Sequence, residues 1–549
     1  MLALLLALAL LLPAAPAAAA APKALESKNV DWIRTVNAPE AVSATFVADH
    51  MYLSTFRGLE VYDVADPATP VKLGALELPL FQNEDVSTNG EILLISRDSV
   101  LGLARLYVVD VSDPADPSIL STLDTSDFDT PYGSIGHTAS CIHDCSYALL
   151  AGWTRGVDVV DLRDPRNPRF ASPRKVRMPN AACSGPGDDA ECDGTHDVQL
   201  DDSGLAWVAG AGGTAAYDVS DPTNPVRRFT TNRRGVSMVL ERRDTQSDGT
   251  AYNDFIHHNS LRRGRTVLIT EEDFRPGCRH SGSLQSWRIG GDGILRPLDK
   301  WEVERDPARS AYCSAHYFDE RDGLLVQGWY EAGARFIDWS RPRRLRQTGY
   351  WIPFRGNVTN AYWAPTDPDG EIAYVLDEQR GIDIIRIDRS APPVSSRPPR
   401  QARNSGISAR PDVSAAIDNG TERVAPGATV RYFVSVRNGQ RRRGPASRAV
   451  VELGAGLSLA SNGNQQRTFR FPRLDRGETA RRGFDVRVAE DAPPWVEASV
   501  VLEISDGDPA NDFGVVRNPT REGLLHKGRR ERAGASSRPL LCTARPQPK

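Results

Sequence analysis

The sequence predicts an all-β protein: a seven-bladed β-propeller followed by an immunoglobulin-like β-sandwich. A motif containing Asp and Pro recurs at intervals of roughly 47 to 60 residues, and two short strand-like runs precede each clear copy. Four strands per unit with this period are typical of a propeller. After a stretch rich in Pro, Ser and Arg, a second series of alternating apolar and polar runs begins, which is typical of a sandwich.

The first element is the repeat motif itself. VYDVADPATPV places Asp63 after a run of β-branched and aromatic residues, with Pro at the fourth and seventh positions beyond it. The Asp can accept hydrogen bonds from turn amides, and Pro restricts φ, so the motif predicts the third strand, outer turn and fourth strand of a blade. The same spacing follows Asp110, Asp161 and Asp218.

Three weaker copies complete the predicted ring. ARFIDWSRPRRL (334–345) keeps one Pro, SLQSWRIGGDGILRPLDKWEV (283–303) has a Gly-Gly-Asp-Gly turn, and GIDIIRIDRSAPP (381–393) lacks a fourth strand. VDWIRTVNAP (30–39) has the pattern of an unpaired outer strand. Its pairing with the last copy would close seven blades over residues 28–388 and leave no open sheet edge. An array of β-sandwiches, the alternative, does not account for this complementary pair.

The motifs YVVDVSDP, VDVVDLRDP and AYDVSDP are similar to those of the LVIVD-repeat family of exported β-propellers, which includes the choice-of-anchor B group. The resemblance covers residues 28–388 and implies the propeller fold and export. It implies no activity, because the family is largely without assigned biochemistry.

The regions outside the propeller have distinct compositions. Residues 1–21 have an apolar run followed by Ala-x-Ala sites, which predicts a signal peptide too short to cross a bilayer. We therefore expect an exported protein, located in the periplasm, at the cell surface or outside the cell, with no transmembrane segment. Residues 389–410 predict a linker, and residues 411–516 resemble the immunoglobulin-like CARDB modules. Residues 517–549 predict a basic, disordered tail.

Export permits disulfides, and the chain has seven cysteines. Proximity along the sequence suggests three pairs and one single cysteine: Cys141 with Cys145, Cys183 with Cys192, Cys278 with Cys313, and Cys542. A zinc site made of cysteines is disfavoured, because no CxxC pair faces another.

The charge pattern bears on the partners. The net charge is −4 and both signs are interspersed, so no nucleic-acid surface is expected. We expect a monomer whose channel face meets a protein, a peptide or a glycan.

Histidines begin the innermost strand of four consecutive predicted blades. Because these strands line the axis of a propeller, equivalent positions form a ring. The residues are His137 in GHTAS, His196 in THDVQ, His258 in HHNSL and His316 in AHYFD; blade two has NEDVS instead. Four imidazoles facing one point suit Zn, Cu, Fe or Ni. Two alternatives remain: these histidines satisfy backbone groups of a hydrated channel, or they hydrogen-bond to a ligand without any metal.

Two acidic turns are expected at the same face of the propeller. LITEED contains Glu272 and YVLDEQ contains Asp377. Such carboxylates could orient metal-bound imidazoles or act as a general base, so both residues are catalytic candidates.

Two functions remain open. One is an exported binding or scaffold protein that presents its channel face to a ligand or partner and uses the sandwich for attachment. The other is a metalloenzyme, an oxidoreductase or hydrolase with a four-histidine metal site. The second arrangement resembles in outline the carotenoid oxygenases and the selenium-binding protein family, although no sequence motif supports membership of either.

Overall fold

The described part of the chain is built from β-strands and turns and contains no helix. In this computed structural model the described residues are 24–38, 40–78, 80, 83–97, 104–125, 136–152, 157–171, 195–210, 213–231, 256–272, 282–303, 313–354, 356–392, 413–421, 423–439, 443–444, 446–493, 495–502 and 513–520. Accordingly, these residues include no helix that could cross a bilayer. The predicted signal peptide, Cys183, Cys192, Cys278, Cys542 and most of the predicted linker and tail lie outside these ranges.

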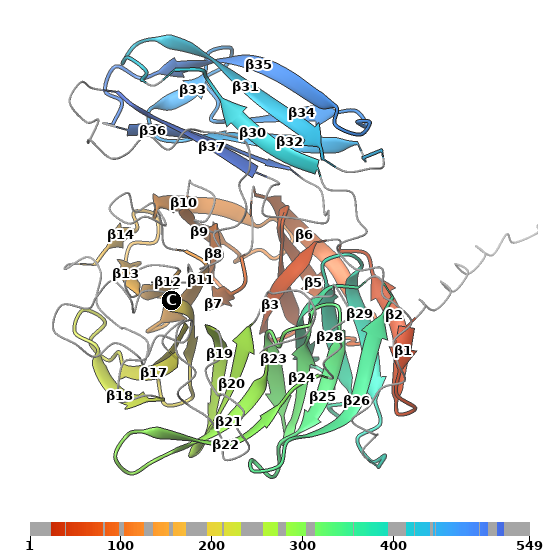
Figure 1. Cartoon of the computed structure of the whole chain (residues 1–549). Coiled ribbons are helices and arrows are strands. Elements are labelled where there is room, and N and C mark those ends of the chain that lie inside the picture. Colours follow the sequence, from red (N-terminus) through yellow and green to blue (C-terminus); the bar gives the residue numbers. More distant parts are fainter. Residues whose placement is uncertain are drawn as a thin grey trace, which may run out of the picture.

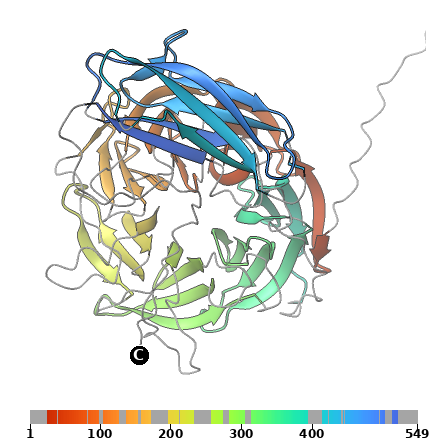
Figure 2. The same cartoon turned by 45° about the horizontal axis from the view of Figure 1, so that its top comes forward.

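The described residues between 24 and 387 form seven antiparallel sheets that are arranged in a ring, as in a β-propeller (Figures 1 and 2). Sheet 1 has β3 (Ala41–Val47), β4 (His50–Thr55), β5 (Gly58–Asp63) and β6 (Val71–Glu77). Sheet 2 has β7 (Val86–Thr88), β8 (Ile92–Arg97), β9 (Arg105–Asp110) and β10 (Ser118–Asp124). Sheet 3 has β11 (Thr138–Ile142), β12 (Tyr147–Ala151), β13 (Asp158–Asp161) and β14 (Arg169–Phe170).

The remaining four sheets continue the ring. Sheet 4 has β15 (Thr195–Leu200), β16 (Leu205–Gly210), β17 (Gly213–Asp218) and β18 (Val226–Thr230). Sheet 5 has β19 (Ile256–Arg263), β20 (Thr266–Glu272), β21 (Leu284–Ile289) and β22 (Leu295–Trp301). Sheet 6 has β23 (Phe318–Arg321), β24 (Leu324–Gly328), β25 (Ala334–Asp338), β26 (Arg346–Pro353) and β1 (Ala24–Glu26). Sheet 7 has β27 (Val358–Trp363), β28 (Ile372–Asp377), β29 (Gly381–Ile387) and β2 (Val30–Val36).

The repeat motif forms the turn that the sequence predicts. The Oδ1 atom of Asp63 accepts a hydrogen bond from the amide of Ala65 at 2.8 Å, between β5 and β6. Asp110, Asp161 and Asp218 accept the equivalent bond from the amide two residues later, each at 3.1 Å. The carboxylate therefore closes the outer turn, far from the axis.

The ring closes through the N-terminal strands. β2 pairs with β29, with Val30 opposite Ile387, so the strand before the first sheet becomes the outer strand of the last one, as predicted. β27 in turn contacts β3, which joins sheet 7 to sheet 1. β1 pairs with the outer strand β26 of sheet 6, a contact that no sequence pattern predicts.

Adjacent sheets are held together by apolar side chains. Trp329, which follows β24, is fully buried and meets Trp301 of sheet 5 edge to face, with ring centroids 5.1 Å apart. A similar cluster joins sheets 2 and 3 through Leu94, Val108 and Leu150. Packing between sheets supplies the core of the ring and leaves the axis to polar residues.

Residues 413–519 form two further sheets that enclose one hydrophobic core. One sheet has β30 (Val413–Asp418), β31 (Thr429–Asn438), β35 (Thr479–Val488) and β33 (Leu457–Leu459). The other has β34 (Gln466–Phe471), β32 (Ser447–Leu453), β36 (Trp495–Leu502) and β37 (Phe513–Pro519). We refer to these two sheets as the sandwich.

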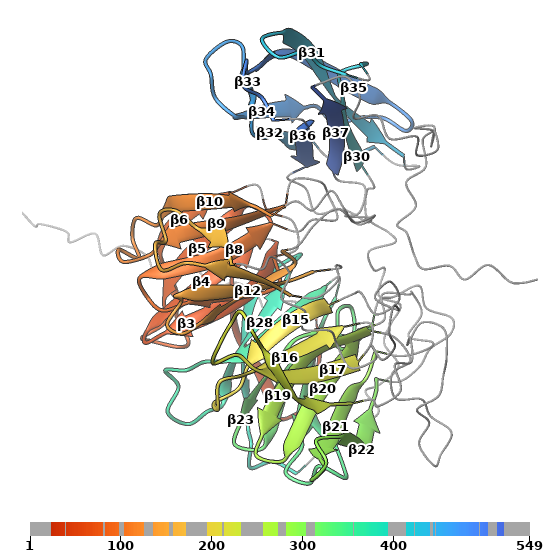
Figure 3. The same ribbon diagram turned by 90° about the vertical axis from the view of Figure 1, so that its left-hand side faces the viewer.

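The sandwich lies beside sheet 2 (Figure 3). A buried ion pair joins the two. Arg97, at the end of β8, is fully buried, pairs with the carboxylate of Glu452 and donates a hydrogen bond to Ser499 Oγ at 2.8 Å. Arg105 Nη1 donates to the other oxygen of Glu452 at 2.6 Å. The sandwich is therefore held by specific polar contacts to the propeller.

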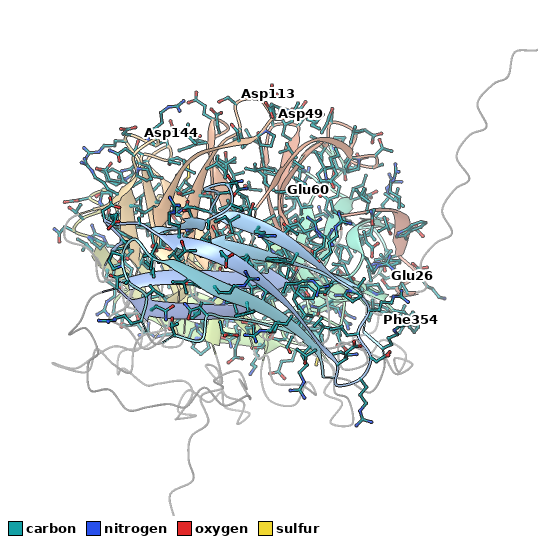
Figure 4. All side chains as sticks on the ribbon, turned by 90° about the horizontal axis from the view of Figure 1, so that it is seen from above. Glu26, Asp49, Glu60, Asp113, Asp144 and Phe354 are labelled. Carbon is teal, nitrogen blue, oxygen red and sulfur yellow. A yellow bond between two sulfur atoms is a disulfide. The ribbon has the colours of Figure 1, made fainter. Side chains whose placement is uncertain are left out.

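The propeller has two distinct faces. The histidine face is defined as the one at which the innermost strands of sheets 3 to 6 begin; because β8 runs antiparallel to β7, Arg97 also lies there. Figure 4 shows Asp49, Asp113 and Asp144 along one rim of the molecule. These three residues lie in turns at the opposite ends of the strands.

Candidate functional site

Four histidines from four neighbouring sheets converge at the axis. His137 precedes β11 of sheet 3, His196 lies in β15, His258 lies in β19, and His316 precedes β23. All four are buried, with exposed fractions of 3% or less. Ring centroids are 4.3 Å apart for His137 and His196, 4.2 Å for His196 and His258, and 4.1 Å for His258 and His316. The structure thus brings together the four histidines of the predicted ring.

The carboxylate of Glu84, from sheet 2, occupies the centre of this group. Its Oε2 atom lies 3.0 Å from Nε2 of His137, 3.2 Å from Nε2 of His258 and 3.9 Å from Nε2 of His196. Its Oε1 atom lies 3.6 Å from Nε2 of His316. One carboxylate therefore faces the same ring nitrogen of all four histidines.

Glu272 approaches from the end of β20. Its Oε2 atom lies 3.8 Å from Nε2 of His196 and 3.7 Å from Nε2 of His258. Its other oxygen accepts a hydrogen bond from the hydroxyl of Tyr330. The sequence-predicted residue Glu272 therefore does reach the histidines, and Tyr330 fixes its orientation.

The spacing of these atoms fits a metal ion. For metal–ligand bonds of about 2.1 Å, adjacent ligand atoms lie about 3.0 Å apart in an octahedron and about 3.4 Å apart in a tetrahedron. Three overlapping groups have all their ligand atoms within 4.8 Å of one another: Glu84, His258 and His316; Glu84, His137 and His196; and His196, His258 and Glu272. The six residues form one cluster, which we call the axial cluster.

The buried position of the axial cluster shifts the pKa values of its members in different directions. Burial lowers the pKa of His258 to about 3 and holds the pKa of His196 well below its ordinary range. Burial opposes ionisation of Glu84, but the nearby His137 and His316 hold the pKa of this carboxyl well below its usual value. Burial opposes the charge of His316, but the carboxylates of Glu84 and Glu272 raise the pKa of this imidazole. Neutral imidazoles and an ionised carboxylate are the forms in which these side chains bind metals, so a metal ion would have to displace a proton from His316.

Some polar atoms of the axial cluster lack a hydrogen bond. Among the described residues, no partner with hydrogen-bond geometry is present for Oε2 of Glu84, Nε2 of His316 or either ring nitrogen of His258. Buried polar atoms are normally paired, so unpaired atoms aimed at one point indicate a missing ligand. A cation at that point would satisfy Oε2 of Glu84 and the Nε2 atoms of His258 and His316. It would not satisfy Nδ1 of His258, because the two nitrogens of one imidazole point in different directions.

A backbone contact orients one of the histidines. Nδ1 of His316 lies 2.9 Å from the carbonyl oxygen of Thr359, so this nitrogen carries the proton and Nε2 is directed at Glu84. His257 is different, because its Nδ1 lies 2.9 Å from the hydroxyl of Thr214, outside the axial cluster. Of the two adjacent histidines, only His258 belongs to the site.

Asp377 lies apart from the axial cluster. Its carboxylate accepts hydrogen bonds from the amide of Gln379 at 2.8 Å, in the turn between β28 and β29, and from the amide of Asn357, directly before β27, at 3.1 Å. Burial raises the pKa of Asp377 to about 7. The structure therefore gives this residue a role in the turn and does not bring it to the histidines.

The predicted disulfides have different outcomes. Cys141 and Cys145 form a disulfide, as predicted. Cys313 is also disulfide-bonded, but Cys278 lies outside the described residues, as do Cys183 and Cys192. Those two pairings stay predictions.

A cavity of about 230 Å³ follows the axis beyond the axial cluster, away from the histidine face. Its wall includes Glu84, Asp85, Tyr317, Asp319 and Tyr362. The ring of Tyr317 also contacts the rings of His258 and His316, with centroids 4.6 and 5.1 Å away. The cavity and the axial cluster therefore share walls.

Comparison with known proteins supports the repeat. The LVIVD repeat model matches residues 102–125, which include β9 and β10 of sheet 2. A search of curated proteins finds no match.

Solved structures with similarity to the chain include propellers and a CARDB domain. The WD40 repeats of RRP9 are 10% identical, with a TM-score of 0.43, over 67% of this chain and 100% of that one. The WD40 β-propeller domain of Doa1 is 10% identical, with a TM-score of 0.41, over 66% and 99%. The CARDB domain of a Pyrococcus furiosus protein in complex with di-metal ions is 15% identical, with a TM-score of 0.17, over 20% and 90%. Identities this low convey nothing about ligands or partners.

Proposed function

We propose that this protein is a metal-binding β-propeller whose axial cluster holds one divalent transition metal. His137, His196, His258 and His316 supply imidazole nitrogens, Glu84 supplies a carboxylate oxygen, and Glu272 is a further ligand or orients the histidines. The observation that carries this proposal is the convergence of four buried Nε2 atoms on Glu84, at 3.0 to 3.9 Å. Imidazole-rich sites with one or two carboxylates suit Zn, Cu, Fe or Ni.

A purely structural role for the axial cluster is the competing interpretation. In that case Glu84 would be neutralised by a protonated histidine and the network would hold the innermost strands together. The unpaired atoms on Glu84, His258 and His316 argue against it, because a structural network is expected to satisfy its buried members.

The test is the metal content of the full-length protein, purified after export into an oxidising compartment. We expect about one transition-metal ion per chain by elemental analysis, and its loss in His196→Ala and His258→Ala. His257→Ala is a matched control, because it removes the adjacent buried histidine that faces Thr214. Metal-free protein, or metal that survives both cluster substitutions, would overturn the proposal. Far-UV circular dichroism establishes that each variant is folded.

We further infer that the seven sheets are the blades of a seven-bladed propeller and that the sandwich is an immunoglobulin-like module related to CARDB domains. The support is the sheet topology and the shared core of residues 413–502. The N-terminal signal of residues 1–21 leads us to propose export to the periplasm, the cell surface or the extracellular space.

A binding or scaffold role is compatible with the metal site. The propeller fold and the LVIVD repeat are consistent with binding a protein, peptide or glycan at the channel face, and we propose that the protein acts as a monomer. The buried contact between Arg97 and Glu452 fixes the sandwich on the histidine face, so attachment through the sandwich would also orient the channel.

A further inference from the structure

The turn between β11 and β12 contains three successive residues in the left-handed conformation. The φ angles of His143, Asp144 and Cys145 are 51°, 54° and 56°. Residues other than glycine rarely adopt this conformation, and then as single residues, because the Cβ atom lies too close to the following carbonyl oxygen. In the described part of the chain, no other consecutive non-glycine residues have positive φ. The backbone of this turn is therefore strained.

A disulfide closes the same turn. It joins Cys141 to Cys145, which are four positions apart in the sequence. A short loop gains the least stability from a cross-link, because closing it removes little freedom from the unfolded chain. Every residue of β11 is also paired with β12, so the hairpin is held together by its backbone. The disulfide therefore adds little to the stability of sheet 3, while it closes a strained turn.

The turn is open to solvent at the end of β11 that points away from the histidine face. His143 and Asp144 are exposed and Cys141 is partly exposed, whereas Cys145 is only 2% exposed. Figure 4 shows Asp144 at the rim of the molecule. The carbonyl oxygen of Asp144 accepts a hydrogen bond from Nδ2 of Asn89, in sheet 2, at 3.3 Å. A reactant in solution can therefore approach Cys141 while the ring stays intact.

We propose that the Cys141–Cys145 disulfide is a redox-active site that is reduced by dithiols. Strained or exposed disulfides are the labile ones, whereas structural disulfides resist reduction. A thiolate of the dithiol attacks Sγ of Cys141, the S–S bond breaks, and Cys145 leaves as a thiolate that takes up a proton. The second thiolate of the reductant then attacks the reductant's own sulfur in the mixed disulfide and releases Cys141, which also takes up a proton. The dithiol is oxidised to a disulfide, and the protein gains two electrons and two protons.

Cys313 provides a comparison within the same chain. It is also disulfide-bonded, but it is buried in an apolar cluster that includes Leu284 of sheet 5 and Phe318 of sheet 6. Its φ is not left-handed. A disulfide in these surroundings is shielded from thiols, as structural disulfides are. We therefore expect the two disulfides to differ in how easily they are reduced.

The test is the equilibration of the full-length protein, purified after export into an oxidising compartment, with buffers of reduced and oxidised dithiothreitol. Free cysteines are labelled with iodoacetamide, and mass spectrometry of the peptides reports each disulfide separately. We expect Cys141 and Cys145 to be labelled at a ratio of reduced to oxidised dithiothreitol at least about 10-fold below the ratio that labels Cys313. Labelling of Cys313 first, or at the same ratio, would overturn the proposal. The axial cluster takes no part in this reaction, so the outcome does not affect the proposed metal site.

Glycine substitutions test the contribution of the backbone. His143→Gly should shift the equilibrium towards the disulfide by about 5-fold, because glycine adopts positive φ without the steric penalty of a Cβ atom. Ser146→Gly is the matched control, since Ser146 lies in the same turn and its φ is not positive. Equal shifts in the two variants would contradict the proposal.

Removal of the disulfide tests the structural interpretation. The double variant Cys141→Ser and Cys145→Ser should unfold within about 3 °C of the wild type, because the loop that the bond closes is so short. A larger loss of thermal stability would show that the bond is structural and would also overturn the proposal.

Discussion

Replacing Glu84 by Gln is the sharpest test of the axial cluster. The substitution keeps the size and shape of the side chain but removes the charge that faces all four Nε2 atoms. Glu272→Gln makes the same change at a carboxylate that lies 3.7 to 3.8 Å from only two of them. The two variants therefore separate a direct ligand from a residue that orients ligands.

The expected magnitude follows from the number of ligands. Zinc binding at four-ligand protein sites contributes about 10–16 kcal/mol, or about 2.5–4 kcal/mol per ligand, so Glu84→Gln should weaken zinc binding by about 100- to 1,000-fold. Residues that orient ligands cost about 10- to 100-fold, which is the range expected for Glu272→Gln. Competition with a chromophoric chelator measures both.

The control for this comparison is Asp377→Asn, which should leave zinc affinity unchanged because the carboxylate of Asp377 accepts hydrogen bonds from the backbone amides of Asn357 and Gln379 and lies apart from the axial cluster. The interpretation of Glu84 as a ligand is refuted if Glu84→Gln binds zinc as tightly as the wild type. It is also refuted if Asp377→Asn weakens binding to the same extent, since the effect would then report general destabilisation.

Three further predictions concern stability. Arg97→Met and Glu452→Gln should each lower the free energy of unfolding, measured with a chemical denaturant, by about 3–5 kcal/mol, because each change leaves a buried charge unpaired. The double variant should lose clearly less than the sum of the two losses, and additive losses would contradict the coupling. Asp377 has a pKa of about 7 in the folded protein and an ordinary value of 3.8, so the folded state holds the proton more tightly than the unfolded state does. The stability that Asp377 contributes is therefore complete below pH 4 and is lost as the pH rises towards 7. Asp377→Asn should remove this pH-dependent loss, which amounts to at most about 4 kcal/mol. The unfolding temperature of the variant should therefore exceed that of the wild type at pH 8 but not at pH 4. Equal differences at both pH values would contradict the raised pKa of Asp377. Trp329→Ala should lower the free energy of unfolding, measured by thermal denaturation, by about 3–5 kcal/mol, because it removes the ring that packs against Trp301 between two sheets and leaves a cavity. A loss below about 1 kcal/mol would show that this contact is dispensable.

Much of the fold follows from local chemistry that the sequence shows directly. The spacing of Asp63 and its prolines specifies a turn whose hydrogen bond depends on residues two positions apart. The missing outer strand after Ile387 and the isolated strand at Val30 are complementary, so their pairing could be predicted although hundreds of residues separate them. The strand β1 could not be predicted in the same way, because a three-residue strand carries almost no pattern.

The candidate site was only partly accessible from the sequence. The four histidines could be grouped because a repeat places equivalent residues on one ring. Glu84 occupies the equivalent position in sheet 2, and carboxylates as well as imidazoles bind metals, so the stretch NEDVS contained a signal that a search for histidine alone overlooks. Tyr330 and Tyr317 had no such signal, since their roles depend on how neighbouring sheets meet.

The sequence by itself determined the repeat, its outer turns and the ring of histidines, because each depends on residues close along the chain or at a fixed period. Only the tertiary structure decided that Glu272 reaches the histidines while Asp377 closes a turn, since both lie in acidic turns that look alike in the sequence. The ion pair of Arg97 with Glu452 joins residues 355 positions apart, with no periodicity to connect them. Contacts of that kind exist only once the two units have packed together, so no local pattern can encode them.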